Sequence, residues 1–115
     1  MHEYGIVQSL LQRVEEEVSR RGATAVERIR LRLGELSGVE SDLLHEAFRV
    51  FRQRSVCAAA ELEIVSATAS WECSRCRSEV PRGGRLWCSE CEAPARLVSG
   101  DEIVLERIEM EVPDV

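Results

Sequence analysis

Four cysteines, arranged as two Cys-x-x-Cys pairs, restrict the fold of this chain more than any other feature of its sequence. The pairs are Cys73 with Cys76 and Cys88 with Cys91, and eleven residues separate them. Each pair forms a turn that places two thiolates on one side of a Zn²⁺ ion, and two such turns complete a tetrahedral shell. A segment of roughly 30 residues cannot bury a sufficient core alone. The spacing therefore predicts a small zinc-binding module over residues 70–98, which the metal folds.

Two other uses of these cysteines stay open at the level of the sequence. They are disulfides or free thiols, and a rubredoxin-like site that holds iron for electron transfer. A reducing compartment disfavours disulfides, but ligand softness and geometry do not separate zinc from iron in a tetrahedral sulfur site. Whichever metal binds, four cysteines fill the shell and leave no position for water or substrate. The site is therefore predicted to be structural.

The rest of the chain carries the hydrophobic patterns of two helices. Apolar residues recur at steps of three and four from Glu3 to Arg21, and Gly22 follows at the position where helices commonly end. A second helix is predicted to run to about Gln53, with Ser37 or Ser41 as its N-cap. Its buried stripe is predicted to consist of Leu43, Leu44, Ala47, Phe48 and Phe51.

Alternating apolar and polar residues predict three strands, over residues 27–33, 60–67 and 102–112. The last strand is expected to return to the sheet of the first two. The predicted fold class is α+β, with two helices packed on a small three-stranded sheet and an inserted zinc-ribbon-like module. The predicted domains are residues 1–69 with 99–115, and residues 70–98.

Composition narrows the functional classes. The chain is 44% hydrophobic and 31% charged, which is typical of a globular protein. No apolar run reaches the ~18 residues of a membrane span, and a signal peptide is not evident, so we expect a cytoplasmic protein that does not contact membranes. The net charge is −6, and the cysteine module lacks the basic patch that nucleic acids require. No catalytic constellation is found, so an enzyme is not expected. Cys57 is read as a small buried hydrophobe.

The first residues form a second candidate metal site. The α-amine of Met1, the His2 amide nitrogen and the His2 imidazole can close two chelate rings on one ion, and the Glu3 carboxylate is near enough to add an oxygen. Nitrogen and oxygen donors in a tetragonal set suit Ni(II) or Cu(II). An isolated histidine at a terminus is more often only a solvated surface residue, so this signal is weak when taken alone. His45, in the second predicted helix, is interpreted as a structural histidine.

Four segments together resemble one family of proteins. They are the opening Met1–Val7 (MHEYGIV), the segment Gly34–Glu40 (GELSGVE), the two cysteine pairs, and Ser99–Ile103 (SGDEI). In this combination the chain resembles the HypA/HybF family of hydrogenase nickel incorporation proteins over nearly its whole length. The eleven-residue interval between the cysteine pairs is slightly shorter than expected for the family, and Cys57 is an additional thiol.

The resemblance implies a nickel metallochaperone. It places a Ni²⁺ cargo at His2 and Glu3 and a structural Zn²⁺ at Cys73, Cys76, Cys88 and Cys91. It also implies two partners, a HypB-type GTPase and the large subunit of NiFe-hydrogenase, while urease as a client and a homodimer are left open. The alternative is a zinc-ribbon module that binds nucleic acid or another protein, which only the cysteine pairs favour.

Overall fold

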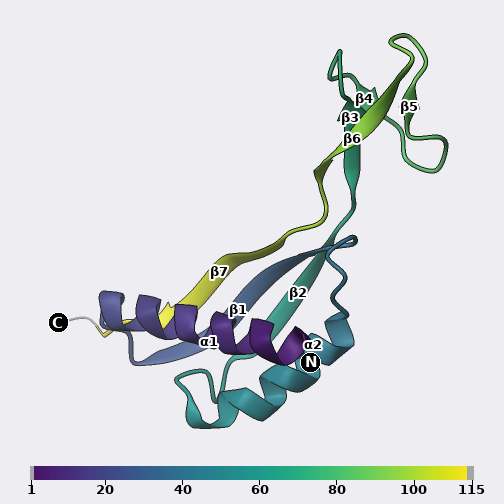
Figure 1. Ribbon diagram of the computed structural model, residues 1–115. Helices are drawn as coiled ribbons and strands as arrows, with labels where there is room; N and C mark the ends of the chain where they lie inside the picture. Colours follow the sequence, from purple (N-terminus) through teal and green to yellow (C-terminus); the bar gives the residue numbers. More distant parts are fainter. Residues whose placement is uncertain (1, 114–115) are drawn as a thin grey trace. The chain divides into compact units, whose positions relative to one another are not determined.

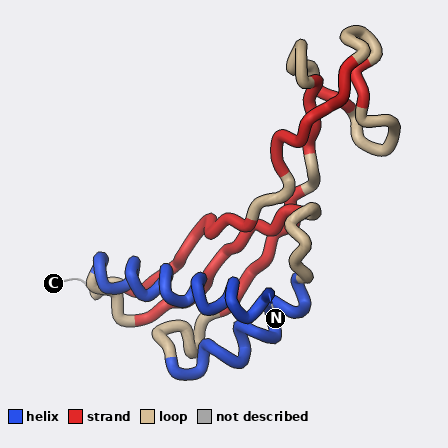
Figure 2. Tube along the Cα trace, in the orientation of Figure 1, coloured by secondary structure: helices blue, strands red, loops and turns tan. Residues whose placement is uncertain are grey.

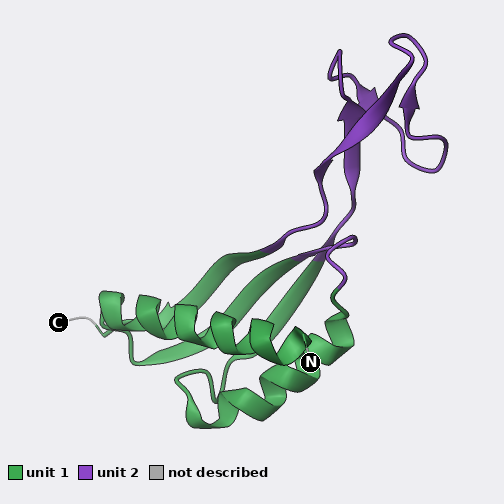
Figure 3. Ribbon diagram, viewed as in Figure 1, with its two compact units in different colours: residues 1–32, 39–65, 104–115 green, residues 33–38, 66–103 purple. Residues whose placement is uncertain are grey.

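The computed structural model describes residues 2–113, which form two compact units (Figure 3). Unit 1 comprises the described residues up to Arg32, together with Val39–Val65 and those from Val104 onward. Unit 2 comprises Leu33–Gly38 and Ser66–Ile103. The described N-terminal residues therefore belong to unit 1, and both cysteine pairs belong to unit 2.

Two long helices and a three-stranded sheet build most of unit 1 (Figures 1 and 2). In chain order the elements are α1 (His2–Arg21), β1 (Ala25–Gly34), α2 (Ser41–Phe51), the short 3-10 helix η1 (Arg52–Arg54), β2 (Glu61–Ala67) and β7 (Ile103–Glu111). The strand order is β2-β1-β7, with β1 and β2 running in one direction and β7 in the other. The predicted α+β class is confirmed, as is the return of the last strand to the first sheet.

The helices cover one face of this sheet (Figure 2). Gly22, with φ +64°, ends α1 where the sequence predicted. No helix within residues 2–113 is both long enough and apolar enough to cross a membrane. The side chains buried between the helices and the sheet are Val7, Leu10, Leu11 and Val14 of α1, Val26, Ile29 and Leu31 of β1, and Leu44, Ala47 and Phe48 of α2.

Ion pairs occupy the other face of the sheet. Arg28, Arg30 and Arg32 alternate along the central strand β1, and their guanidinium groups lie 3.3 to 3.8 Å from carboxylates on the strands at either side. These carboxylates belong to Glu61 and Glu63 on β2 and to Glu106 and Glu109 on β7. Because these side chains are partly exposed, each pair adds little stability. Together they neutralise the arginines of β1.

Two details of the second helix differ from the sequence-based expectation. Neither Ser37 nor Ser41 caps α2, because Glu40 is the N-cap residue and no side chain donates or accepts there. The backbone N–H of Ser37 instead donates to the Gly34 carbonyl at 3.0 Å, closing a turn after β1. The side chain of Leu43 is 41% exposed, since the buried stripe of α2 is centred on Leu44, Ala47 and Phe48 and Leu43 lies beside it.

Unit 2 contains a second, four-stranded sheet (Figure 1). Its strands are β3 (Ser70–Cys73), β4 (Glu79–Val80), β5 (Trp87–Cys88) and β6 (Ala93–Ser99), in the antiparallel order β4-β3-β6-β5. Its buried core is small and consists of Cys73, Val80 and Ala93, with Trp71 among the partly buried residues packed against them. Few apolar groups are therefore available to hold this unit together.

Three segments that are distant in the sequence meet in unit 2, at Gly34, Ala69 and Gly100. The N–H of Leu36 donates to the Gly100 carbonyl at 2.7 Å, and the N–H of Gly34 donates to the Glu102 carbonyl at 2.9 Å. A Cβ atom at Gly34 would collide with the Gly100 carbonyl, and one at Gly100, where φ is +111°, would collide with the Ala69 backbone. Glycine is therefore required at both positions. This requirement explains why glycine occurs at these positions in the segments Gly34–Glu40 and Ser99–Ile103.

The Glu35 carboxylate stabilises this junction through hydrogen bonds. It accepts a hydrogen bond from the Ala69 N–H at 2.6 Å and is bound by two nitrogens of the Arg82 guanidinium at 2.9 and 3.0 Å. The Ala69 hydrogen bond, and secondly Arg82, hold the pKa of Glu35 below its ordinary value of 4.5. Arg82 lies between the two cysteine pairs, so Glu35 connects the loop between them to the segment after β1.

The Glu35 carboxyl group is expected to titrate below pH 4.5 in the folded protein. Because its folded pKa is lowered, its contribution to stability is complete above the unfolded pKa and is lost as the pH falls through the folded pKa. Arg82→Ala should raise the titration midpoint only part of the way, because the Ala69 hydrogen bond remains. Carbon-detected NMR of the Glu35 carboxyl measures both midpoints. A wild-type midpoint at or above 4.5 contradicts the contact.

Candidate metal centre

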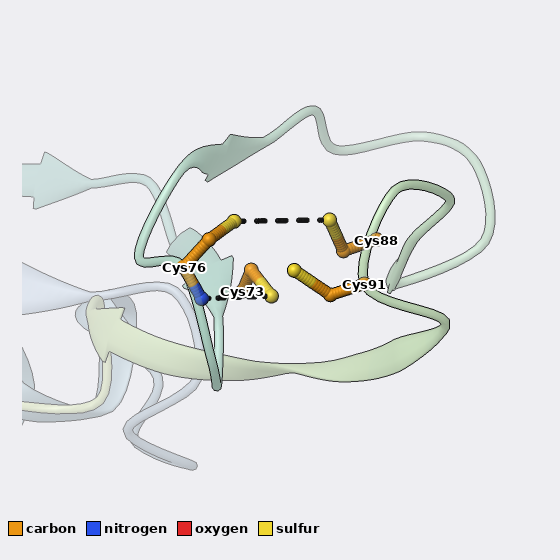
Figure 4. Close-up of side chains that lie close together, drawn as sticks. All are labelled: Cys73, Cys76, Cys88 and Cys91. Carbon is orange, nitrogen blue, oxygen red and sulfur yellow. Dashed lines mark hydrogen bonds between the residues drawn. The ribbon is translucent and has the colours of Figure 1, made fainter.

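The four cysteine sulfurs of unit 2 converge on one point (Figure 4). Cys73 ends β3 and Cys88 ends β5, while Cys76 and Cys91 lie in the turns that follow these strands. All four Sγ atoms lie within 4.8 Å of one another, and each cysteine is a free thiol. The structure therefore brings together the four residues that the spacing predicted.

The distances between these sulfurs fit a tetrahedral metal. With metal–sulfur bonds of about 2.3 Å, the sulfurs of such a shell lie about 3.8 Å apart. The Sγ atoms of Cys76 and Cys88 are 3.9 Å apart. Four thiolates are soft donors of the kind that zinc and iron–sulfur sites use. The cluster is a structural metal site, because a shell of four protein ligands has no open position for a substrate.

Hydrogen-bonding groups beside two of the sulfurs favour the thiolate form, which is the form that binds a metal. The backbone N–H groups of Cys76 and Arg75 lie 3.4 and 3.3 Å from the Cys73 Sγ and lower the pKa of that thiol. The Ser78 hydroxyl lies 3.3 Å from the Cys76 Sγ, and the hydroxyl and backbone N–H of Ser78 together lower the pKa of Cys76 to about 6. The hydrogen bond to Cys76 raises the pKa of Cys91 to about 12. Metal binding must displace this proton, so affinity falls as the pH falls.

The residue after each cysteine pair adopts a left-handed backbone conformation. The φ angle is +61° at Arg77 and +49° at Glu92. Glycine adopts this conformation freely, whereas it costs other residues about 1–2 kcal/mol. Both turns therefore have the backbone geometry that favours glycine, although neither contains glycine at this position.

Arg77→Gly and Glu92→Gly should each stabilise unit 2 by about 0.5–1 kcal/mol. Glycine removes the free-energy cost of the left-handed conformation, but it also makes the unfolded chain more flexible, and this offsets part of the gain. Both side chains are exposed, so little packing is lost. Thermal unfolding of the zinc-loaded protein measures the effect. Ser89→Gly is the matched control, because Ser89 is exposed in the second turn without a positive φ; stabilisation of equal size at Ser89 would refute the explanation.

The predicted nickel ligands His2 and Glu3 open α1, in unit 1. His2 is exposed and Glu3 is half-buried, while Met1, whose α-amine is a predicted donor, lies outside the described residues. The first four N–H groups of a helix have no partner within the helix, so the His2 amide nitrogen is accessible. Successive helical side chains project about 100° apart. The structure therefore places both residues in the first turn of α1.

The other residues that the sequence singled out take no part in a metal cluster. His45 is half-buried on α2. Cys57 is fully buried, as expected of a small hydrophobe, and burial raises the pKa of its thiol. Within residues 2–113, the four cysteines are the one group of three or more histidine, cysteine or acidic side chains that could hold a metal.

Comparison with known proteins gives consistent similarities over almost the whole chain. The family model described as "Hydrogenase/urease nickel incorporation, metallochaperone, hypA" matches residues 1–110. The hydrogenase maturation factor HypA of Wolinella succinogenes is 42% identical, in an alignment that covers 99% of this chain and 98% of that protein.

Two solved structures agree with this similarity. The solution structure of the nickel metallochaperone HypA from Helicobacter pylori aligns with a TM-score of 0.75 at 30% identity, covering 96% of this chain and 98% of that one. A second solution structure, of a HypA protein, aligns with a TM-score of 0.83 at 32% identity and covers 98% of both chains.

Proposed function

The chain belongs to the HypA family of hydrogenase and urease nickel incorporation proteins, and from this premise we propose that it binds Ni(II) through His2 and Glu3 and delivers the ion to the large subunit of NiFe-hydrogenase. A protein of this family is a metallochaperone in hydrogenase maturation and not an enzyme. The observation that supports the N-terminal site is the exposure of His2 at the first position of α1, where helical N–H groups lack partners.

The proposed chelate uses nitrogens that the start of the chain can offer together. The α-amine, the His2 amide nitrogen and the His2 imidazole close two rings around one Ni(II), and the Glu3 carboxylate adds an oxygen. The amine and imidazole must be unprotonated, so nickel affinity should fall as the pH falls.

A site of few ligands at an exposed terminus suits a cargo that must be handed on. A recipient protein can displace the donors one at a time, without opening a buried cavity. This contrasts with the cysteine cluster, in which Cys73 is buried and four thiolates from two turns would surround the metal. We assign Ni²⁺ as transient cargo to the N-terminus and Zn²⁺, held by Cys73, Cys76, Cys88 and Cys91, as a permanent structural ion.

The proposed assignment extends to domains, partners and compartment. Residues 1–69 with 99–115 would form the nickel-binding domain and residues 70–98 the zinc-binding domain. A HypB-type GTPase and the hydrogenase large subunit are the proposed partners, while urease as a client and a homodimer stay open. The cytoplasm is the proposed compartment, because a zinc site of four thiolates persists where thiols stay reduced.

A maturation experiment tests the proposed delivery. In a bacterium that lacks its own HypA-family protein, the wild-type chain should restore hydrogenase activity and nickel in the large subunit, whereas His2→Ala should restore neither. His45→Ala is the matched control, since it removes the other histidine of the chain and should restore both. Equal restoration by His2→Ala and the wild type would exclude delivery through the N-terminus, even if the family assignment stands.

A further inference from the structure

The four cysteines of the cluster differ in their access to solvent. Cys76 is exposed, in the turn that follows β3. Cys88 and Cys91 are half-buried, and Cys73 is fully buried. Oxidation of cysteine follows thiolate character and exposure. Because a bound metal holds all of its cysteine ligands as thiolates, exposure is the property that distinguishes the four. An oxidant in solution therefore meets Cys76 first.

A second sulfur lies within reach of Cys76. The Sγ atoms of Cys76 and Cys88 are 3.9 Å apart and belong to different cysteine pairs (Figure 4). A disulfide would bring them closer by about 2 Å. Cys88 ends β5, a two-residue strand at the edge of its sheet that pairs with β6 alone. A short edge strand moves at little cost, so Cys88 is well placed to react with an oxidised Cys76.

Cys73 is a poorer partner for Cys76, although both lie in the same turn. It ends β3, which is paired on both sides, with β4 and with β6. Its side chain belongs to the buried core of unit 2, and the backbone N–H groups of Arg75 and Cys76 donate to its sulfur. Moving this sulfur would disturb the core and two hydrogen bonds. Structure within the pair therefore disfavours a bond that crosses one turn only.

We propose that Cys76 and Cys88 form a modification site for hydroperoxides, at which oxidation joins the two cysteine pairs by a disulfide. The Cys76 thiolate attacks one peroxide oxygen, the O–O bond breaks, and hydroxide leaves. The Cys88 thiolate then attacks the sulfur of the resulting sulfenic acid and displaces a second hydroxide. The two sulfurs together lose two electrons, and hydrogen peroxide is reduced to two hydroxide ions. This inference rests on the proposed zinc assignment and not on the nickel ligands.

Oxidation at this site acts on unit 2 and spares unit 1. The disulfide removes two of the four metal ligands, and the buried core of unit 2 is small, so the oxidised unit releases zinc and unfolds. Cys57, the one cysteine of unit 1, is fully buried. Thiol–disulfide exchange with a thiol reductant reverses the modification. Hydroperoxides therefore switch off the cysteine unit while α1 and α2 stay folded.

Peroxide treatment of the full chain, with its zinc content measured beforehand, tests the proposal. A chromophoric chelator should record release of about one zinc ion per chain, and differential alkylation with mass spectrometry should find Cys76–Cys88 as the first disulfide. A first disulfide that contains Cys73 or Cys91 would overturn the assignment. A chain that carries zinc and keeps it under peroxide would overturn the proposal and leave the zinc assignment intact, whereas a chain that binds no zinc would overturn both.

Two further measurements test the order of reactivity and its reversal. Substoichiometric N-ethylmaleimide should label Cys76 at least about tenfold more often than Cys73, and equal labelling would remove the argument from exposure. Cys57→Ala is the matched control and should release zinc at the wild-type rate; protection by this substitution would place the reactive thiol in unit 1. Dithiothreitol with added Zn²⁺ should restore the dispersed NMR signals of Ser66–Ile103. Failure to recover them would exclude a reversible switch.

Discussion

His2→Ala, in a zinc-loaded protein with its native N-terminus, is expected to lose the Ni(II) site of about one ion per chain. Removing the imidazole opens one of the two proposed chelate rings and leaves the α-amine, the amide nitrogen of position 2 and the Glu3 carboxylate as donors. Because loss of a partner that only orients a metal ligand already costs 10–100-fold in affinity, loss of the ligand itself should weaken binding by at least about 100-fold. Equilibrium dialysis against Ni(II) measures the effect directly.

The chain offers a close control for this experiment. His45→Ala removes an imidazole from the half-buried face of α2 and should leave nickel stoichiometry and affinity unchanged. A Gly-Ser extension before Met1 keeps both histidines but turns the α-amine into an amide, so it should weaken nickel binding like His2→Ala. Binding that survives the extension but not His2→Ala would show that the imidazole acts without the amine, and binding that survives both would place nickel elsewhere.

The cysteine site was the part of the structure that the sequence predicted best. Two ligands with two residues between them are brought together by a single turn, so the geometry of Cys73 with Cys76 depends on few other residues. The same holds for Cys88 with Cys91. Because a structural zinc ion takes four ligands, the two turns together are expected to bind one ion. The helices and the first sheet were also predictable, because their burial follows the periods of α-helix and strand.

Features that depend on contacts distant in the sequence were not predictable. Glu35 and Arg82 are far apart in the sequence, and no local pattern pairs them, yet together with Ala69 they hold the junction of unit 2. The predicted N-cap of α2 was wrong for a different, local reason. The Ser37 N–H closes a turn with the Gly34 carbonyl directly after β1, and α2 begins only at Ser41, with Glu40 as its N-cap residue.

The N-terminal site shows a different limit of prediction from sequence. His2 and Glu3 have the residue types that Ni(II) prefers, but a helix that begins at His2 separates their side chains. The sequence shows which donors are present, and the structure shows that His2 is exposed and Glu3 is half-buried in the first turn of α1.

Cys73→Ser is expected to remove zinc and unfold most of unit 2 while unit 1 stays folded. Cys73 is fully buried in a core of only three residues, with Val80 and Ala93, so apolar contacts alone cannot hold this unit. A structural zinc ion contributes about 10–16 kcal/mol of apparent binding free energy, and a three-cysteine site forfeits much of it. NMR spectra should lose the dispersed amide signals of Ser66–Ile103 and keep those of α1 and α2.

Cys57→Ala is the matched control for the loss of a thiol, because Cys57 is equally buried but belongs to unit 1. It should leave zinc content at about one ion per chain, as expected for four remaining cluster ligands. Since the proposed nickel donors all lie at the N-terminus, Cys73→Ser should also retain a residual Ni(II) site, and this separates the two metal sites. Unchanged zinc content in Cys73→Ser would show that the cluster is not the zinc site, whereas loss of nickel together with zinc would show that the nickel donors depend on the folded cysteine unit.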